Sequence, residues 1–407
     1  MKKLLSILCA AVLLATLVIT CVSCGGSSVS ADFKVGALLI GDENEGYTYA
    51  HINGIRTAAK ELGMSDDQII WKYTVPEDEK CYDAAIDLVE QGCSVIFSNS
   101  YGHQSHMKQA AQECPDVTFV AMTGDQAATS GLSNYKNAFT GVYQSRYVAG
   151  VVAGMKLAEL VADGKLTDAN YDGDNIKLGY VGAYPYAEVV SGFTAYYLGV
   201  KSVVENVTMQ VTYTNSWFDI TAEGTVAEAL AADGCVIISQ HADSTGAPAA
   251  VQALQDKGQV IYCVGYNVDM LSVAPNAALT SPTNTWAVYY KYAMETAANG
   301  GTIDTNWAKG YEADAVGITA LGSACAAGTQ EKVDEVVKGL KDGSIKVFDT
   351  SKFTVGGATL TEYLADVDGD FAPDTNAIWD GYFHESEMRS APYFDIRIDG
   401  IVENNNN

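Results

Sequence analysis

The sequence predicts an α/β protein that folds as two similar lobes, each built on a doubly wound parallel sheet. Short runs rich in β-branched residues alternate with longer helical patterns, which is typical of βαβ units. The alternation starts twice along the chain, so it describes two units of similar size. With 407 residues, the chain also exceeds the length that one hydrophobic core usually supports.

The first unit contains predicted strands separated by predicted helices. Its helices stop at residues that commonly end a helix, namely Gly63, Gly92 and Pro115. We expect strands at 33–40, 68–73, 94–99 and 117–122, and helices at 47–62, 81–92 and 105–113.

The second unit repeats the pattern. We expect strands at 177–181, 209–214, 235–239 and 260–264, and helices at 189–203, 220–232 and 247–257. The stretch 138–160 between the units is too apolar for a loose linker, so we expect the chain to cross from one sheet to the other there. A cleft between the lobes follows, and small ligands usually bind at such interfaces.

The N-terminus predicts export and a lipid anchor. Lys2 and Lys3 precede an apolar run at 4–20, which is shorter than the roughly 20 residues of a membrane span and is typical of a signal peptide. Ser23 precedes Cys24, as in a bacterial lipobox, and a Gly-Gly-Ser-Ser stretch follows. We therefore expect a signal peptide at 1–24, a lipidated Cys24, a flexible linker at 25–32 and an extracytoplasmic protein tethered to the cell membrane. An ordinary signal peptide cut near Ala31 is the alternative.

Charge and cysteine content limit the possible partners. The formal net charge of −26 argues against nucleic acid and against anionic lipid as partners, since both require a basic surface. The composition, 48% apolar and 18% charged, is that of a globular protein. Cysteines after the leader occur singly, and Cys93, Cys235 and Cys263 lie in apolar strand-like runs. We expect free thiols rather than disulfides.

Four motifs combine aromatic and polar residues just after predicted strands. They are GDENEGYTYAH at 41–51, NSWFD at 215–219, QHADS at 240–244 and GYNVDM at 265–270. In open α/β sheets, ligands bind at the carboxyl ends of the strands. The flat faces of Tyr47, Tyr49 and Trp217 favour stacking on a planar heterocycle.

These four motifs, in this order, resemble the basic membrane protein family. That family comprises substrate-binding lipoproteins of ABC importers with a type I periplasmic-binding fold, and its better-understood members bind purine nucleosides or bases. The resemblance covers 33–286 and fades beyond it. It implies a small-molecule ligand, a purine base or nucleoside, and ABC permease subunits as partners. We expect lobe 1 at 33–142 plus 279–306, lobe 2 at 143–278 plus 307–359, and an unassigned C-terminal extension at 360–407.

The resemblance also assigns candidate ligand-binding residues. Tyr47 on lobe 1 and Trp217 on lobe 2 are the expected stacking pair. The remaining candidates are Asp42, Tyr49, His51, Ser100, Tyr101, Asp219, Gln240, His241, Asp243, Asn267, Asp269, Asn284 and Trp286.

Structural roles stay open for several of these residues. Tyr47 also suits packing on its own lobe, and Asp219 and Asp243 suit the caps of the helices that follow them. Segment 98–102 also suits a helix-capping turn, and Asn267 and Asp269 also suit a turn at a strand end. Phe218 favours core packing.

One departure from the family concerns the kind of purine. Many nucleoside-binding members have a lysine in a Ser-x-x-Lys-like segment, whereas this chain has SPTNTW at 281–286. The motifs at 46–51 and 284–286 are more similar to the branch associated with free purine bases. We favour a purine and leave base against nucleoside open.

Metal binding and catalysis find little support. His103 and His106 lie three apart on an expected surface helix without further ligands. The segment 366–370 resembles the start of a calcium loop, but Phe371 stands where glycine is expected and the final Glu is missing. No nucleophile elbow, P-loop or zinc spacing occurs, so we expect neither metal nor enzyme activity. The alternatives are a sugar or autoinducer receptor of the same fold, and a surface lipoprotein that acts through protein partners.

Overall fold

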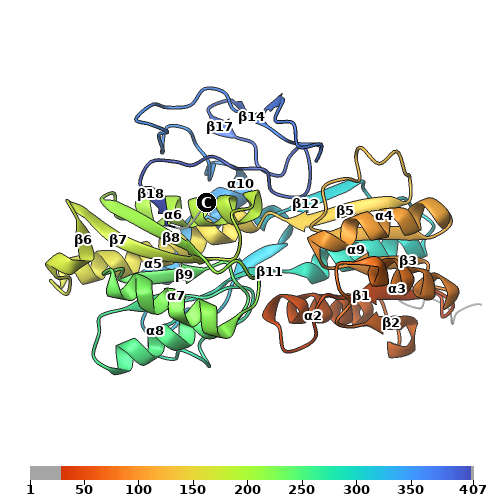
Figure 1. Ribbon diagram of the computed structural model, residues 1–407, viewed down its shortest axis with the longest axis horizontal. Helices are drawn as coiled ribbons and strands as arrows, with labels where there is room; N and C mark the ends of the chain where they lie inside the picture. Colours follow the sequence, from red (N-terminus) through yellow and green to blue (C-terminus); the bar gives the residue numbers. More distant parts are fainter. Residues whose placement is uncertain (1–28, 405–407) are drawn as a thin grey trace, which may run out of the picture.

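The structure, a computed structural model, describes residues 29–404 and consists of two α/β lobes joined by several chain crossings (Figure 1). The expected signal peptide, Cys24 and the first part of the linker lie outside the described residues. Among residues 29–404, no helix has both the length and the apolar character needed to cross a membrane.

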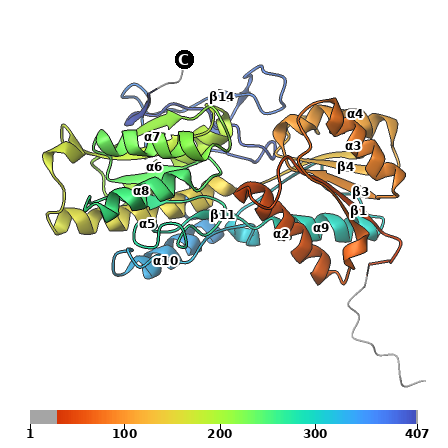
Figure 2. The same ribbon diagram turned by 60° about the horizontal axis from the view of Figure 1, so that its bottom comes forward.

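Lobe 1 is built on a six-stranded parallel sheet with the order β12-β5-β4-β3-β1-β2. Helices α2 and α9 pack together on one face, and α3 and α4 pack together on the other (Figures 1 and 2). The strands are β1 Val35–Leu38, β2 Ile69–Lys72, β3 Val95–Ser98, β4 Thr118–Met122, β5 Tyr135–Thr140 and β12 Asn306–Lys309. The helices are α2 Gly46–Glu61, α3 Glu79–Glu90, α4 Gln104–Glu113 and α9 Trp286–Ala298, with short 3₁₀ turns η1 Asp66–Gln68 and η2 Tyr101–His103.

Lobe 2 has a second sheet with the order β10-β9-β7-β8-β18, to which β6 adds an antiparallel pairing. The strands are β6 Tyr171–Asp172, β7 Asn175–Gly182, β8 Val207–Tyr213, β9 Ile237–Gln240, β10 Tyr262–Val264 and β18 Ile401–Glu403. The helices are α5 Val142–Ala162, α6 Ala187–Lys201, α7 Ile220–Ala232, α8 Gly246–Asp256 and α10 Thr329–Asp342, with η3 Asp168–Asn170.

Helices α5 and α6 cross at very short range in the core of lobe 2. A Cβ on Gly150 would lie 2.1 Å from the carbonyl oxygen of Tyr196, and one on Gly199 would lie 2.1 Å from that of Tyr147. Both glycines are therefore required by the approach of the two backbones. Helix α5 is buried on almost every side, and its sequence is accordingly apolar all round. This burial explains why the stretch 138–160 is too apolar for a loose linker.

The chain crosses between the lobes at three places. The first crossing joins β5 to α5, inside the stretch 138–160 that the sequence singled out. The other two flank a two-stranded antiparallel ladder of β11 Pro282–Asn284 and β13 Val316–Ile318, with η4 Tyr311–Ala313 between β12 and β13. The expected boundary between 306 and 307 falls inside β12, which pairs with β5. Trp307 is buried there against Tyr289, with ring centroids 4.9 Å apart, which holds β12 in lobe 1.

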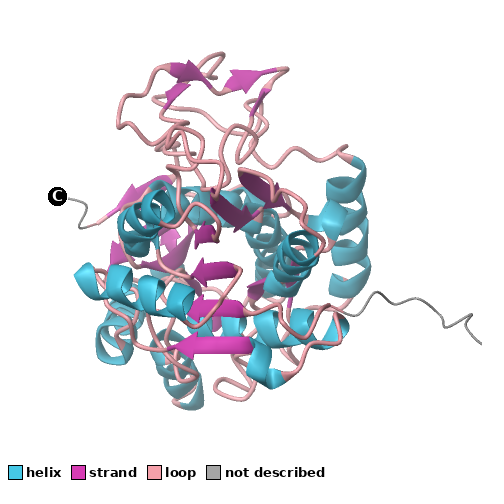
Figure 3. Ribbon diagram, turned by 90° about the vertical axis from the view of Figure 1, so that its right-hand side faces the viewer, coloured by secondary structure: helices cyan, strands magenta, loops and turns pink. Residues whose placement is uncertain are grey.

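Residues 360–404, here called the C-terminal arm, lie along the top of lobe 2 in Figure 1, and one loop extends toward lobe 1. The arm is mostly loop (Figure 3), with short strands β14 Leu364–Ala365, β15 Thr375–Asn376, β16 Ile378–Trp379 and β17 Tyr382–Phe383 before β18. Phe394 stacks on Phe348 at 4.1 Å, and β18 pairs with β8. The extension that the sequence left unassigned thus completes the sheet of lobe 2.

Two smaller expectations have clear outcomes in the described chain. All six cysteines among residues 29–404 are free. His103, by contrast, does not lie on a surface helix. It ends the turn η2 and is fully buried. Its Nε2 lies 2.9 Å from the carbonyl oxygen of Val75, which gives the buried ring a hydrogen-bond partner.

Candidate functional site

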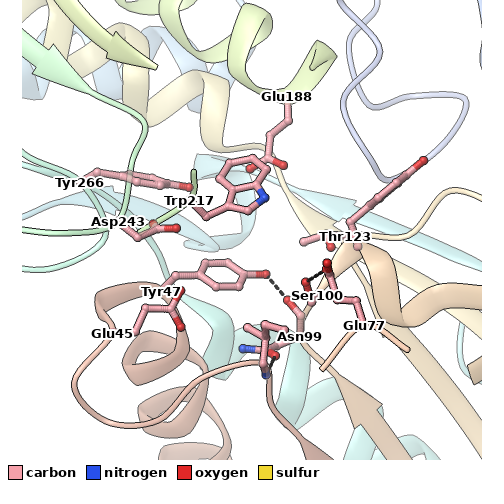
Figure 4. A pocket seen from close by; sticks show the side chains of 12 residues that line it. Glu45, Tyr47, Glu77, Asn99, Ser100, Thr123, Glu188, Trp217, Asp243 and Tyr266 are labelled. Atoms are coloured by element: carbon pink, nitrogen blue, oxygen red, sulfur yellow. Dashed lines mark hydrogen bonds between the residues drawn. The ribbon is translucent and has the colours of Figure 1, made fainter. Parts of the chain in front are cut away.

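A cavity between the two lobes collects residues from the strand ends of both sheets (Figure 4). The volume of the cavity is about 110 Å³, which is below the roughly 300–1,000 Å³ that is usual for small-molecule sites. The lining residues are Ile40, Glu45, Tyr47, Glu77, Asn99, Ser100, Tyr101, Thr123, Glu188, Trp217, Asp243 and Tyr266.

Two aromatic side chains enter this cavity from opposite lobes. Tyr47 lies in the first turn of α2, and its hydroxyl donates a 2.6 Å hydrogen bond to the carbonyl oxygen of Asn99. Trp217 follows β8, where its ring packs against Tyr184 and Tyr186 at centroid distances of 5.5 and 6.3 Å. Both rings are therefore held in place by neighbours, and Figure 4 shows them on opposite sides of the space. Flat faces of this kind favour stacking on a planar ligand.

Carboxyl groups surround the aromatic pair. Burial raises the pKa of Asp243 well above its usual value, and the nearby carboxylates of Glu45 and Glu188 raise it further. Burial also raises the pKa of Glu188 to about 7, against the opposing effect of the Arg146 guanidinium. The pKa of Glu45 is raised for the same main reason. Near neutral pH the cavity thus presents carboxylates that accept hydrogen bonds together with a carboxylic acid that can donate one.

The lobe 1 wall carries a second set of polar contacts. Ser100 donates from its hydroxyl to Glu77 Oε1 at 2.5 Å, and Tyr101 donates to Asp125 Oδ2 at 3.0 Å. Both donors follow β3, as the sequence pattern predicted for the carboxyl end of a strand. Ser100 and Tyr101 line the cavity, while Asp125 lies behind it and is 6% exposed.

A row of side-chain hydrogen bonds orients Asp243. Asn267 Nδ2 donates to Asp243 Oδ1 at 3.0 Å, and Asn284 Nδ2 donates to Asn267 Oδ1 at 2.8 Å. Thr140 at the end of β5 then donates to Asn284. Asn267 has a left-handed backbone, with φ of +61°, which asparagine tolerates better than most residues. Asn267 and Asn284 lie outside the cavity and fix the carboxyl group that lines it.

Gln240 and His241 lie in the wall of lobe 2 rather than at its surface. Arg146 on α5 donates from Nη1 to the Gln240 carbonyl oxygen at 2.5 Å, and its guanidinium lies 3.7 Å from the ring centre of Tyr266. His241 Nε2 lies 3.4 Å from Glu188 Oε1. Burial and the Arg146 charge lower the pKa of His241 well below its usual value, so the imidazole is neutral. This layer supports Tyr266 and Glu188, which do line the cavity.

Three predicted carboxylates hold local turns. Asp219 is the N-cap of α7 and accepts from the N–H groups of Thr221 and Ala222 at 3.0 and 2.9 Å. Asp42 accepts from the backbone of Asn44 at 2.8 Å, and Asp269 accepts from the N–H two residues further on at 2.8 Å. None of the three lines the interlobe cavity.

His51 and Trp286 lie behind Tyr47. The two rings are fully buried and stack with their centroids 4.3 Å apart. His51 Nδ1 lies 2.7 Å from the hydroxyl oxygen of Tyr290. Burial lowers the pKa of His51 to about 3. A second hollow, beside α2 and the start of α9, is lined among others by Tyr49, Asn267, Asp269, Asn284 and Trp286.

The structure thus brings together at the cavity a subset of the predicted residues, namely Tyr47, Ser100, Tyr101, Trp217 and Asp243. Sequence reasoning missed Glu45, Asn99 and Tyr266, which lie within or next to the quoted motifs. It also missed Glu188, for which the available signal was its position just after the carboxyl end of β7.

A model of a known protein family matches residues 40–350, and its description is "Bmp: ABC transporter substrate-binding protein PnrA-like". The chain belongs to the Bmp family. It is therefore an extracytoplasmic solute-binding protein of an ABC transporter, and this family is not enzymatic. The match continues past residue 286, where the motif resemblance ended, and includes β12, β13 and α10.

Individual relatives of this Bmp protein carry different ligand names. The purine-binding protein of Brucella abortus (strain 2308) is 32% identical over 65% of this chain and 69% of that protein. TsgA13 of Haloferax volcanii, named as an ABC transporter glucose-binding protein, is 28% identical over 63% of this chain and 58% of its own length. The solved ABC transporter solute-binding protein from Conexibacter woesei DSM 14684 superposes with a TM-score of 0.61 at 17% identity, covering 77% of this chain and 98% of that chain. This likeness establishes the type I periplasmic-binding fold.

Proposed function

We propose that this Bmp protein captures a purine base or nucleoside in the interlobe cavity and delivers it to an ABC permease. The observation that carries the proposal is the pair of aromatic rings, Tyr47 from lobe 1 and Trp217 from lobe 2, that face the same cavity. Stacking between two rings from different lobes requires closure. Ligand occupancy would therefore be coupled to a closed shape, which a permease can recognise.

The carboxyl groups suit the edge of a purine. Glu45, Glu188 and Asp243 offer acceptors for ring N–H and exocyclic amino groups, and a protonated member offers a donor for a ring nitrogen. The name of the Brucella abortus relative supports a purine. Carboxylates also bind ribose hydroxyls, so a base and a nucleoside are both compatible with this wall.

The first experiment is thermal unfolding of a fragment starting at residue 29 with a panel of nucleobases, nucleosides and simple sugars. A ligand at about 100 times its Kd adds about 2.7 kcal/mol to the free energy of unfolding, which gives a clear shift in Tm. A response to purines alone supports the proposal and distinguishes base from nucleoside. No response to any purine would overturn it.

A sugar ligand is the second candidate. Carboxylates and aromatic rings are also the groups that bind sugar hydroxyls and ring faces, and the name of TsgA13 points to glucose. The same panel separates the two, because a sugar receptor responds to D-glucose or D-arabinose and not to adenine. A panel without any response would favour a surface lipoprotein that acts through protein partners.

We propose further that Cys24 carries the lipid that tethers the protein to the cell membrane. The support is the order of basic, apolar and small residues before Cys24. Cys24→Ala should move the protein from the membrane fraction to the culture medium or periplasm and abolish labelling by a radioactive fatty acid. Cys21→Ala is the matched control and should change neither. Unchanged labelling of Cys24→Ala would overturn this assignment.

A further inference from the structure

We propose that Arg389 of the C-terminal arm is a latch that holds the two lobes together and positions the Tyr101 side of the ligand cavity. Arg389 belongs to a segment fixed on lobe 2, yet its guanidinium reaches a carboxylate of lobe 1. Nη1 of Arg389 lies 3.6 Å from Asp125 Oδ2, and the same oxygen accepts the hydroxyl hydrogen bond of Tyr101. The arm is therefore connected to a cavity residue through a single side chain.

The attachments of the arm differ between the lobes. On lobe 2 they are extensive, because β18 forms a parallel ladder with β8 and Phe394 stacks on Phe348. On lobe 1, besides the close approach of Gly369 to Asp125, the hydrogen bonds and ion pairs of the arm among residues 29–404 are few. They are Arg389 with Asp125, the Thr129 hydroxyl on the Asp368 carbonyl oxygen at 3.3 Å, and the Ser390 hydroxyl on Asn306 Oδ1 at 3.3 Å. These few polar contacts with lobe 1 can break while the arm stays folded on lobe 2.

The guanidinium is oriented before it meets lobe 1. Nε donates to the carbonyl oxygen of Ala391 at 3.2 Å, and Nη2 donates to that of Pro392 at 3.1 Å, both within the arm. Nη1 has no hydrogen-bond partner among residues 29–404 and points between two carboxylates. Asp125 of lobe 1 lies 3.6 Å from Nη1, and Asp366 of the arm lies 3.8 Å from it.

The two carboxylates give the ion pair a way to exchange partners. Arg389 is 8% exposed, and an unpaired charge at such a site would be costly. When the lobes separate, Asp125 moves away with lobe 1 while Asp366 stays beside Arg389 on the arm. The charge then keeps a partner in the open form, so opening does not leave it isolated. Asp125 favours the closed form and Asp366 favours the open form.

In this structure the contacts of Arg389 coexist with contact between the lobes across the cleft. A Cβ on Gly46 of lobe 1 would lie 3.3 Å from the carbonyl oxygen of Asp243 on lobe 2. Ligand affinity rises with the fraction of molecules that adopt the binding-competent form. Because Arg389 adds to the stability of that form, it should raise affinity without touching the ligand. This consequence for affinity rests on the proposed function.

The test compares three isosteric or nearly isosteric variants, Asp125→Asn, Arg389→Gln and Asp366→Asn, with the parent. Small-angle X-ray scattering of the ligand-free proteins measures the radius of gyration, which grows as the lobes open. We expect a larger value for Asp125→Asn and Arg389→Gln, and an equal or smaller one for Asp366→Asn. A purely structural role would make all three variants change in the same direction, and that result would overturn the latch.

Affinity for the purine identified by the panel is the second readout. Asp125→Asn and Arg389→Gln should each weaken it about fivefold, at the lower end of typical coupling between sites. The double variant should be no weaker than either single one, because both remove the same contact. Arg389→Lys, which keeps the charge, should recover part of the affinity and serves if the glutamine variant folds poorly. Unchanged affinity in both single variants would overturn the latch.

The two readouts separate this inference from the proposed function. If the parent binds no purine, the proposed function fails, while scattering still decides the latch. If the parent binds a purine and all variants match it in affinity and radius of gyration, the latch is wrong and the proposed function stands.

Discussion

Replacement of Glu188 by glutamine should change how the stability of the protein depends on pH. Glu188 lies partly buried in the cavity wall, and burial raises its pKa from 4.5 to about 7. The folded state therefore binds more protons than the unfolded state between these values. The neutral carboxyl of Glu188 therefore contributes its full stability below the pKa of the unfolded chain, 4.5. That contribution is lost as pH rises through the pKa of the folded protein, about 7.

The size of this effect follows from the shift. One pKa unit corresponds to about 1.36 kcal/mol, so the raised pKa of Glu188 corresponds to at most about 3 kcal/mol. Glutamine cannot ionise and has nearly the same volume. The free energy of unfolding of Glu188→Gln minus that of the parent should therefore rise by up to about 3 kcal/mol between about pH 4 and pH 8.

Urea unfolding of both proteins at several pH values measures this difference. Glu228→Gln, at an exposed position of α7, is the matched control. Glu385, whose pKa burial also raises to about 7, is present in every protein compared and cancels in the subtraction. A difference for Glu188→Gln that stays constant from pH 4 to pH 8 would refute the argument that burial keeps this carboxyl neutral.

Three further predictions concern the cavity and the frame that holds it. Trp217→Ala should weaken purine binding by about 5- to 150-fold in titration calorimetry, since stacking on one base contributes about 1–3 kcal/mol. Phe218→Ala, at the neighbouring exposed position, should not weaken it. Equal losses in the two variants would argue against stacking. Gly150→Ala should lower the free energy of unfolding by about 1–3 kcal/mol, because the added Cβ would collide with the α6 backbone. Gly224→Ala is the control and should not lower it, because its added Cβ would lie 3.4 Å from the nearest atom. Thermal unfolding of both variants measures the difference. Asp219→Ala should lower the free energy of unfolding by about 0.5–2 kcal/mol, because α7 loses its N-cap, and should leave purine affinity unchanged. A variant with unchanged stability and weaker purine binding would instead indicate that Asp219 contacts the ligand.

Much of the fold could be predicted because both sheets are built from locally encoded units. The strands and helices expected between 33 and 122 and between 177 and 264 occur with boundaries shifted by a few residues. Among the strands that were missed, β5 is six residues long and overlaps the stretch that was read as the crossing between the lobes, whereas β12 and β18 have little local signal. β12 is four residues long and β18 three, and each is defined by a partner far away in the sequence.

The site could be predicted in outline but not residue by residue. Strand-end motifs identified Tyr47, Trp217 and Asp243, which line the cavity. The same motifs contain His51, which packs inside lobe 1, because an aromatic ring suits a core and a ligand equally well. Glu188 was missed since it projects from the start of α6, where sequence alone reads a carboxylate as a favourable first-turn residue.

The pairing of β18 with β8 also has a consequence for the time at which this protein can fold. The Thr208 hydroxyl donates to the carbonyl oxygen of Gly400, a residue 192 positions away along the chain. Contacts of such long separation form late, because the entropy of closing the intervening loop is lost before the contact forms. Until residues 401–403 have been translated, β8 remains an open sheet edge. The sheet of lobe 2 is thus completed only after all of its other strands and the intervening 192 residues are in place, so its edge at β8 stays open until the C-terminal arm has docked.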